Sequence, residues 1–128
     1  MPVNNIEIQN LTKGKLPSLP FANIKKEILG EEFELSLVFV NNARSKNLNN
    51  KYRGKNKPTN ILSFPLSKTV GEIFIAPEVA RKDAPKFELN FDQFITRLFI
   101  HGLLHLDGME HSSKMEEKEA KFMKRFGF

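Results

Sequence analysis

This sequence of 128 residues contains no cysteine and no tryptophan, and it has only three histidines. Without cysteine there is no disulfide framework and no thiolate metal site, which fits a reducing compartment. No apolar run approaches the length needed to span a membrane. The first ten residues lack the basic stretch and apolar segment of a secretory signal. We therefore expect a cytoplasmic protein with no membrane partner.

The composition is that of a globular chain. Hydrophobic residues make up 40% and charged residues 27% of the sequence, and a chain of this length buries roughly two-thirds of its unfolded surface in one domain. We predict a single domain over residues 1–128. Twelve phenylalanines indicate a phenylalanine-rich core, and the net charge of +5 favours polyanions such as nucleic acid.

Hydrophobic periodicity and turn residues predict alternating strands and helices. Strands are expected at residues 3–9, 34–41, 60–64 and 71–76, the last antiparallel to its predecessor because the link between them is short. Helices are expected at residues 18–30, 42–52, 77–85, 91–106 and 113–126. In the short second helix, Ala43, Leu48 and Tyr52 are the candidate anchors. Ser113 and Glu116 resemble a capping box that starts the last helix.

All three histidines lie in one segment, with the spacing H-x3-H-x2-G-x2-H: His101, His105 and His111. Histidines four apart on a helix lie one turn apart on the same face. A glycine then lets the chain reverse so that the third histidine can return. Three neutral nitrogens with an open fourth position are typical of a catalytic zinc site. The alternative interpretation is a set of core or edge histidines, each with a hydrogen-bond partner.

The same spacing occurs in metzincin proteases, H-E-x-x-H-x-x-G-x-x-H, but Gly102 stands where their glutamate base would be. The segment therefore resembles a zinc cradle adapted to another reaction. Gly102 also falls near the centre of the apolar stripe, so we expect a packed element, or less commonly a substrate, to approach its backbone closely. The general base is not identified. Asp107 and Glu110 are the nearest carboxylates, and orienting a histidine is the commoner use of such groups.

A basic loop forms the second group of interest and contains Arg53, Lys55 and Lys57. Two exposed lysines in a turn are usually just solvated. An arginine differs because its planar guanidinium can hold a phosphate through two hydrogen bonds. A metal that polarises a phosphoryl oxygen and an arginine that stabilises the developing charge together suit phosphodiester cleavage.

Three stretches of this sequence resemble the YbeY family of bacterial endoribonucleases. They are YRGKNKPTNILSFP at residues 52–65, GEIFIAPEVA at residues 71–80 and HGLLHLDGMEH at residues 101–111. The family's patterns are close to YRGKDKPTNVLSFP, GDIVI and HGxLHLxGYDH. Met109 and Glu110 replace the usual Tyr-Asp pair, which leaves every expected ligand in place. Residues 1–33 match only in length and hydrophobic pattern.

The resemblance implies an α+β fold, with a small mixed sheet of about four strands, about five helices and a metal site on a helix in the C-terminal half. It implies a zinc-dependent, single-strand-specific endoribonuclease in 16S rRNA maturation and ribosome quality control. One Zn²⁺ per chain would be bound by His101, His105 and His111. The resemblance also carries over a functional role for Arg53. From the residues themselves we predict that Arg53 and His101 are catalytic and that Arg53, Lys55 and Lys57 bind substrate. The implied partners are single-stranded rRNA and the small ribosomal subunit or its assembly factors.

Two other functions are compatible with the sequence. One is a peptidase or other metallohydrolase, against which the missing glutamate at Gly102 argues. The other is a non-enzymatic RNA-binding assembly factor with a structural zinc. The fourth ligand discriminates this assembly factor from an enzyme, because a closed site without cysteine needs a carboxylate such as Asp107 or Glu110, whereas an open position favours catalysis.

Overall fold

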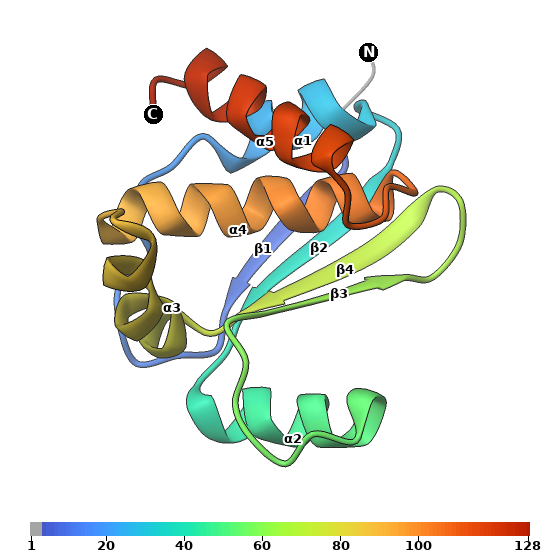
Figure 1. Cartoon of the computed structure of the whole chain (residues 1–128). Coiled ribbons are helices and arrows are strands. Elements are labelled where there is room, and N and C mark those ends of the chain that lie inside the picture. The colour runs from blue at the N-terminus through green and yellow to red at the C-terminus, as the bar shows by residue number, and fades with distance from the viewer. Residues whose placement is uncertain (1–3) are drawn as a thin grey trace.

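The computed structural model describes residues 4–128, and its centre is a sheet of four strands (Figure 1). The strands are β1 (Ile6–Asn10), β2 (Glu34–Phe39), β3 (Ile61–Pro65) and β4 (Val70–Ile75). They lie in the order β1-β2-β4-β3. β1 and β2 are parallel, as are β2 and β4, whereas β3 runs antiparallel to β4. The predicted mixed sheet and the antiparallel hairpin are both confirmed.

Helices cover the two faces of this sheet unequally. They are α1 (Phe21–Leu29), α2 (Asn42–Arg53), α3 (Pro77–Asp83), α4 (Phe91–Leu106) and α5 (Ser113–Arg125), with a 3-10 turn η1 (Ala84–Phe87) after α3. Figure 1 shows α4 against one face of the sheet, α1 and α5 stacked beyond α4, and α2 on the opposite side. α4 is thus a central layer, in contact with β3, β4, α1 and α5.

The sequence of α4 explains both its position and its bounds. Asn90 accepts a hydrogen bond from the backbone N–H of Gln93, whose side chain accepts one from the N–H of Asn90, so the helix starts with a capping box. The helix is apolar over a broad stripe, and its buried residues include Phe94, Ile95, Leu98, Phe99, Ile100, Leu103 and Leu104. Beyond its end Gly108 has a φ of +92°, a conformation that favours glycine, and the chain reverses there.

The main core lies between α4 and the sheet. Leu35, Leu37 and Phe39 of β2 join Ile73 and Ile75 of β4 in one cluster with the apolar stripe of α4. Phe21 of α1 packs edge-on against Phe99, with 5.1 Å between ring centroids. Rigid packing from two sides fixes α4, and therefore the side chains that it carries at its C-terminal end.

The predicted anchors of α2 are confirmed only in part, because the Tyr52 ring packs against the Phe64 ring of β3 with 4.9 Å between centroids, whereas Ala43 does not anchor the helix. Ala43 and Tyr52 are exposed and Leu48 is half-buried, whereas Ser45 and Asn49 are the buried residues of this helix. The Ser45 hydroxyl donates to the carbonyl of Thr59 at 2.6 Å and accepts from its N–H at 2.9 Å. Hydrogen bonds to the following loop therefore help to position α2, and its buried positions are polar, which an apolar pattern does not predict.

Two smaller predictions are also corrected. The cap of α5 is Ser112, whose side chain accepts from the backbone N–H of Met115, so the box expected from Ser113 and Glu116 does not form. Strand β1 begins at Ile6, and Val3, where the prediction placed its start, lies outside the described residues. Within residues 4–128, no helix is both long and apolar enough to cross a lipid bilayer.

Candidate metal centre

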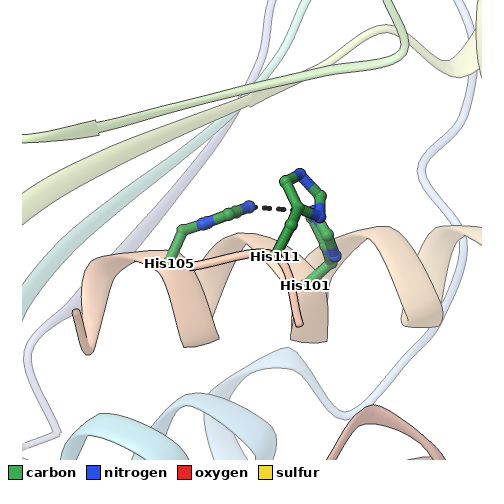
Figure 2. A group of neighbouring side chains, drawn as sticks. All are labelled: His101, His105 and His111. Atoms are coloured by element: carbon green, nitrogen blue, oxygen red, sulfur yellow. Dashed lines mark hydrogen bonds between the residues drawn. The ribbon is translucent and has the colours of Figure 1, made fainter. Parts of the chain in front are cut away.

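The three histidines of the conspicuous segment converge at the C-terminal end of α4 (Figure 2). His101 and His105 come from successive turns of the helix and are half-buried, and His111 returns from the loop after Gly108 and is exposed. One ring nitrogen from each histidine can be chosen so that all three lie within 4.8 Å of one another. The predicted convergence is therefore confirmed.

Hydrogen bonds at the outer nitrogens orient the two helical histidines. His105 Nδ1 lies 2.9 Å from the carbonyl oxygen of Met109. His101 Nδ1 contacts a carboxylate oxygen of Glu119. A carbonyl or carboxylate oxygen accepts, so each Nδ1 carries the proton and each Nε2 presents a lone pair.

The inner nitrogens test whether this arrangement fits a metal ion. His101 Nε2 and His105 Nε2 are 2.9 Å apart, and with both outer nitrogens protonated their lone pairs face each other. Two lone pairs at this distance repel unless a cation lies against both. Neutral imidazoles whose second nitrogen is hydrogen-bonded are the usual histidine ligands of zinc. The donor set therefore fits a divalent metal.

The protonation of His105 agrees with this. Burial is the main cause that lowers the pKa of its imidazole below the ordinary value of 6.5, and the nearby rings of His101 and His111 lower this pKa further. The hydrogen bond to the Met109 carbonyl and the charge of Glu119 raise the pKa, but they do not cancel the shift. A ring with a lowered pKa is neutral at pH 7. His105 therefore presents a ligand nitrogen without first losing a proton.

Glu119 is the functional candidate that the sequence reasoning missed. It lies on α5 and only 6% of it is exposed, whereas Asp107 and Glu110, the carboxylates expected near the histidines, are exposed. Its second oxygen lies 3.9 Å from Arg97 Nε. The sequence position of Glu119 could have indicated its role. Glu119 comes four residues after the buried Met115 and three before Phe122, so it places a carboxylate within the apolar stripe of α5.

The close approach predicted at Gly102 is confirmed, and a packed element causes it. A Cβ at this position would lie 3.0 Å from Cδ1 of Ile73 and 3.1 Å from Cδ1 of Ile61. The carbonyl of Gly102 also accepts a hydrogen bond from the Ser63 hydroxyl at 3.1 Å. Because this position faces β3 and β4, a glutamate side chain there would point into the sheet.

A cleft of about 310 Å³ opens beside the histidines. α4 lines it through Arg97 and His101, β3 and the residue before it through Ile61 and Asn60, and η1 through Phe87. The remaining lining residues are Phe94, Leu98, His111, Ser112, Met115, Glu116 and Glu119. One side of the candidate centre is therefore reached through a mainly apolar cleft that contains one cationic side chain.

Comparison of the sequence with known protein families assigns this chain to a family. Residues 3–127 match the profile of the family described as Endoribonuclease YbeY. The chain belongs to this family. A YbeY endoribonuclease of Sinorhizobium medicae is 36% identical over 117 residues, covering 80% of this chain and 70% of that protein. The YbeY endoribonuclease of Aliarcobacter butzleri is 34% identical over 130 residues, covering 94% of this chain and 91% of that protein.

A solved structure agrees with the YbeY assignment of the fold. The solution structure of TM1509 from Thermotoga maritima matches with a TM-score of 0.70 at 30% identity, over 93% of this chain and 87% of that one. The resemblance read from the three sequence stretches is thus confirmed. The predicted α+β fold, with four strands and five helices, is confirmed for residues 4–128, and the three histidines at and beyond the end of α4 could hold a metal ion.

The basic loop residues of this YbeY-family chain lie outside the cleft beside the histidines. Arg53 is the last residue of α2, and Arg53, Lys55 and Lys57 are all exposed. None of the three lines the cleft, where Arg97 is the cationic residue. The loop is nevertheless held in place, because Asn49 donates to the carbonyl of Lys57 at 2.8 Å. The structure thus gathers the three histidines and presents the three basic residues away from the cleft, at the end of α2 and in the loop that follows it.

Proposed function

We propose that this protein is a zinc-dependent endoribonuclease that cuts single-stranded RNA in the cytoplasm. The observation that carries the proposal is the convergence of three histidines, two with outer nitrogens bonded to acceptors and inner nitrogens 2.9 Å apart. That geometry suits a bound cation, and the family to which the chain belongs is described as an endoribonuclease.

His101, His105 and His111 would hold one Zn²⁺ per chain. A bound zinc would polarise a phosphoryl oxygen and acidify a water molecule. Within residues 4–128, no carboxylate joins the three histidines in a possible ligand group. Three protein ligands with room for a fourth favour catalysis over a closed structural site. This supports an enzyme over an assembly factor whose zinc is only structural.

The chain's own residues supply positioning and charge. The Glu119 carboxylate and the Met109 carbonyl keep the protons of His101 and His105 on the outer nitrogens. Arg53, which we propose as a catalytic residue together with His101, would hold a phosphate oxygen pair, with Lys55 and Lys57 binding flanking phosphates. Gly102 argues against a peptidase, because the position of the peptidase base faces the sheet.

The substrate we propose is ribosomal RNA, cut during 16S rRNA maturation and ribosome quality control on or near the small ribosomal subunit or its assembly factors. The net charge of +5 supports a polyanionic substrate. Both relatives described above are named as YbeY endoribonucleases. Their names support the reaction, and the ribosomal context follows the resemblance of the motifs.

The decisive experiment measures metal content and RNA cleavage in the same untagged preparations. Wild-type protein should contain about one zinc per chain and cut single-stranded RNA, and His101→Ala should lose both properties while keeping its fold by circular dichroism. The His101→Ala preparation also reports contaminating ribonuclease, which would cut equally in both samples. RNA binding without cleavage under any metal condition would support the assembly-factor alternative, and cleavage of peptides without RNA binding would support another metallohydrolase.

A further inference from the structure

We propose that the cleft beside the histidines binds one unpaired nucleobase of the RNA, stacked on the ring of Phe87 next to Arg97. This inference rests on the proposed function and names the part of the substrate that the site would hold. The cleft runs along α4 from His101 past Arg97 to Phe94 and Phe87. Its two ends therefore offer different chemistry, imidazole nitrogens at one and a flat aromatic surface at the other.

Phe87 has the position of a stacking platform. The residue is 49% exposed, which is high for a phenylalanine. Its ring stacks on Phe94 with 5.1 Å between centroids and 20° between planes, and the Arg97 guanidinium lies 5.4 Å from its centroid. Phe94 and Arg97 both come from α4, so the ring is held on its α4 side while much of its surface stays open. A fixed aromatic ring with an open surface suits a base.

The backbone around Phe87 supports a functional reason for this exposure. Glu88 has a φ of +57° and is the one non-glycine residue among residues 4–128 with a left-handed backbone. Its N–H bonds the carbonyl of Pro85, and the N–H of Leu89 bonds that of Ala84, which closes η1 immediately after Phe87. Such conformations are unfavourable for a residue with a side chain, and they concentrate at functional sites. Here the strained turn presents an apolar ring to solvent.

Charge in the cleft favours a base over a phosphate. Glu116 and Glu119 line it together with Arg97, and Arg97 already lies beside the Glu119 carboxylate. Two carboxylates beside one guanidinium leave no net positive charge next to Phe87 and Arg97 to hold a phosphate there. A neutral aromatic base would instead contact Phe87, Phe94 and the flat guanidinium, all of which stack on bases of any sequence.

Size and spacing fit a single base. About 310 Å³ is near the lower limit of small-molecule sites, roughly 300 Å³, so the cleft suits one base better than a base pair. Arg97 and His101 are four residues apart on α4, about 6 Å along the helix axis. A base beside Arg97 would thus place its adjoining phosphate toward the histidines. The geometry provides a reason for single-strand preference, because a paired base cannot leave its stack without cost.

A pair of synthetic backbones tests the proposal without depending on binding register. One is a ribose-phosphate octamer with no bases, and the other is the same octamer carrying one adenine. Wild-type protein should bind the one-base octamer about 5-fold to 150-fold more tightly in fluorescence anisotropy, the range expected for one stacked base. Phe87→Leu keeps apolar contact with Phe94 but loses the flat ring, and it should bind both octamers equally.

Two further variants complete the design. Phe87→Trp should keep or increase the preference for the one-base octamer. Leu66→Ala is the matched control, because Leu66 is 59% exposed and does not line the cleft, and it should keep the full preference. Equal binding of both octamers by wild type, or an undiminished preference in Phe87→Leu, would overturn the proposal. A preference that depends on Phe87 in a protein that cuts no RNA would support base binding and contradict the nuclease activity.

Discussion

At the scale of single residues, the candidate centre depends on where two protons lie. His101 and His105 each have an acceptor at Nδ1, Glu119 for one ring and the Met109 carbonyl for the other. The acceptors decide which nitrogen of each ring keeps its lone pair, and so whether three donors converge or point apart. The residues around the ligands therefore matter almost as much as the ligands.

We predict that Glu119→Gln weakens zinc binding by about 10-fold to 100-fold, the range found when the partner of a histidine ligand is altered. Glutamine is isosteric but uncharged, so it holds the outer proton of His101 less firmly. Competition with a calibrated chelator measures the affinity. Glu117→Gln is the matched control, since Glu117 is an exposed residue of the same helix. Equal zinc affinity in the two variants would show that Glu119 does not position His101.

The lowered pKa of His105 predicts a pH dependence of stability in the metal-free protein. Its folded-state pKa lies below the unfolded value of about 6.5, mainly because of burial. Below that pH the unfolded chain binds more protons than the folded one, so stability falls as pH falls, and the loss ends at the folded pKa. Thermal unfolding between pH 7.5 and 5 should show this fall, and His105→Gln should make the curve flatter. An unchanged slope in His105→Gln would contradict the assignment to this ring.

At the scale of elements, the molecule uses a polar connection where an apolar one was expected. Ser45 and Asn49 of α2 bond the backbone of the loop that carries the basic residues. Helix and loop are thus one unit, attached to the entry of β3. This unit holds the backbone around Arg53, at the end of α2, next to the entry of β3.

We expect Ser45→Ala to lower the free energy of unfolding by about 1–3 kcal/mol, because it leaves the N–H and carbonyl of Thr59 without their partner in a buried position. Urea denaturation measures the change. Asn47→Ala, at an exposed position of the same helix, should change stability by about 0.5 kcal/mol or less. Similar values for both variants would mean that the serine contacts contribute little.

Substitution of Arg53 tests whether α2 and the loop after it take part in catalysis. We predict that Arg53→Ala lowers kcat/KM on single-stranded RNA by about 100-fold or more, the effect of removing one donor to developing charge, while zinc content and circular dichroism stay unchanged. Arg53→Lys should recover little, because lysine keeps the charge but not the paired donors. Arg44→Ala, in the first turn of α2 and exposed, is the control. Full activity of Arg53→Ala would restrict the loop to a structural role.

The elements differ in how far their sequence determines them. α4 was predictable because sixteen residues carry one apolar period, and β3 and β4 because a short link joins two β-rich runs. The order of strands β1-β2-β4 in the sheet was not predictable, because parallel strands pair across long stretches of chain and leave no local sequence pattern. Glu119 was missed for the same reason, because its contact with His101 spans 18 residues and two helices.

At the scale of the whole molecule, we propose that charge and shape act on the same substrate. The net charge of +5 attracts any polyanion, while the cleft at the histidines has a volume that would suit about one base. The first effect is unspecific, and the second would select for an open strand. Together they would give a nuclease that binds RNA broadly and acts on its unpaired parts.

Salt dependence of binding separates these effects. If Arg53, Lys55 and Lys57 each neutralise one phosphate, the slope of log affinity against log salt for single-stranded RNA is about −2. Affinity then falls about 20-fold between 50 and 200 mM salt. We predict this fall for single-stranded RNA, and weak binding with little cleavage for a duplex of the same sequence. Fluorescence anisotropy over a salt series and a parallel cleavage assay provide the two readouts.

A pair of double variants assigns the slope to the loop. Lys55→Gln with Lys57→Gln removes two of the three contacts, so the slope should become less steep by about 1.4. Lys118→Gln with Lys121→Gln removes the same charge from the exposed surface of α5 and should leave the slope nearly unchanged, because charges outside the contact release no counterions. Equal changes in the two double variants would mean that RNA responds only to net charge, and the basic loop would then not be the binding surface.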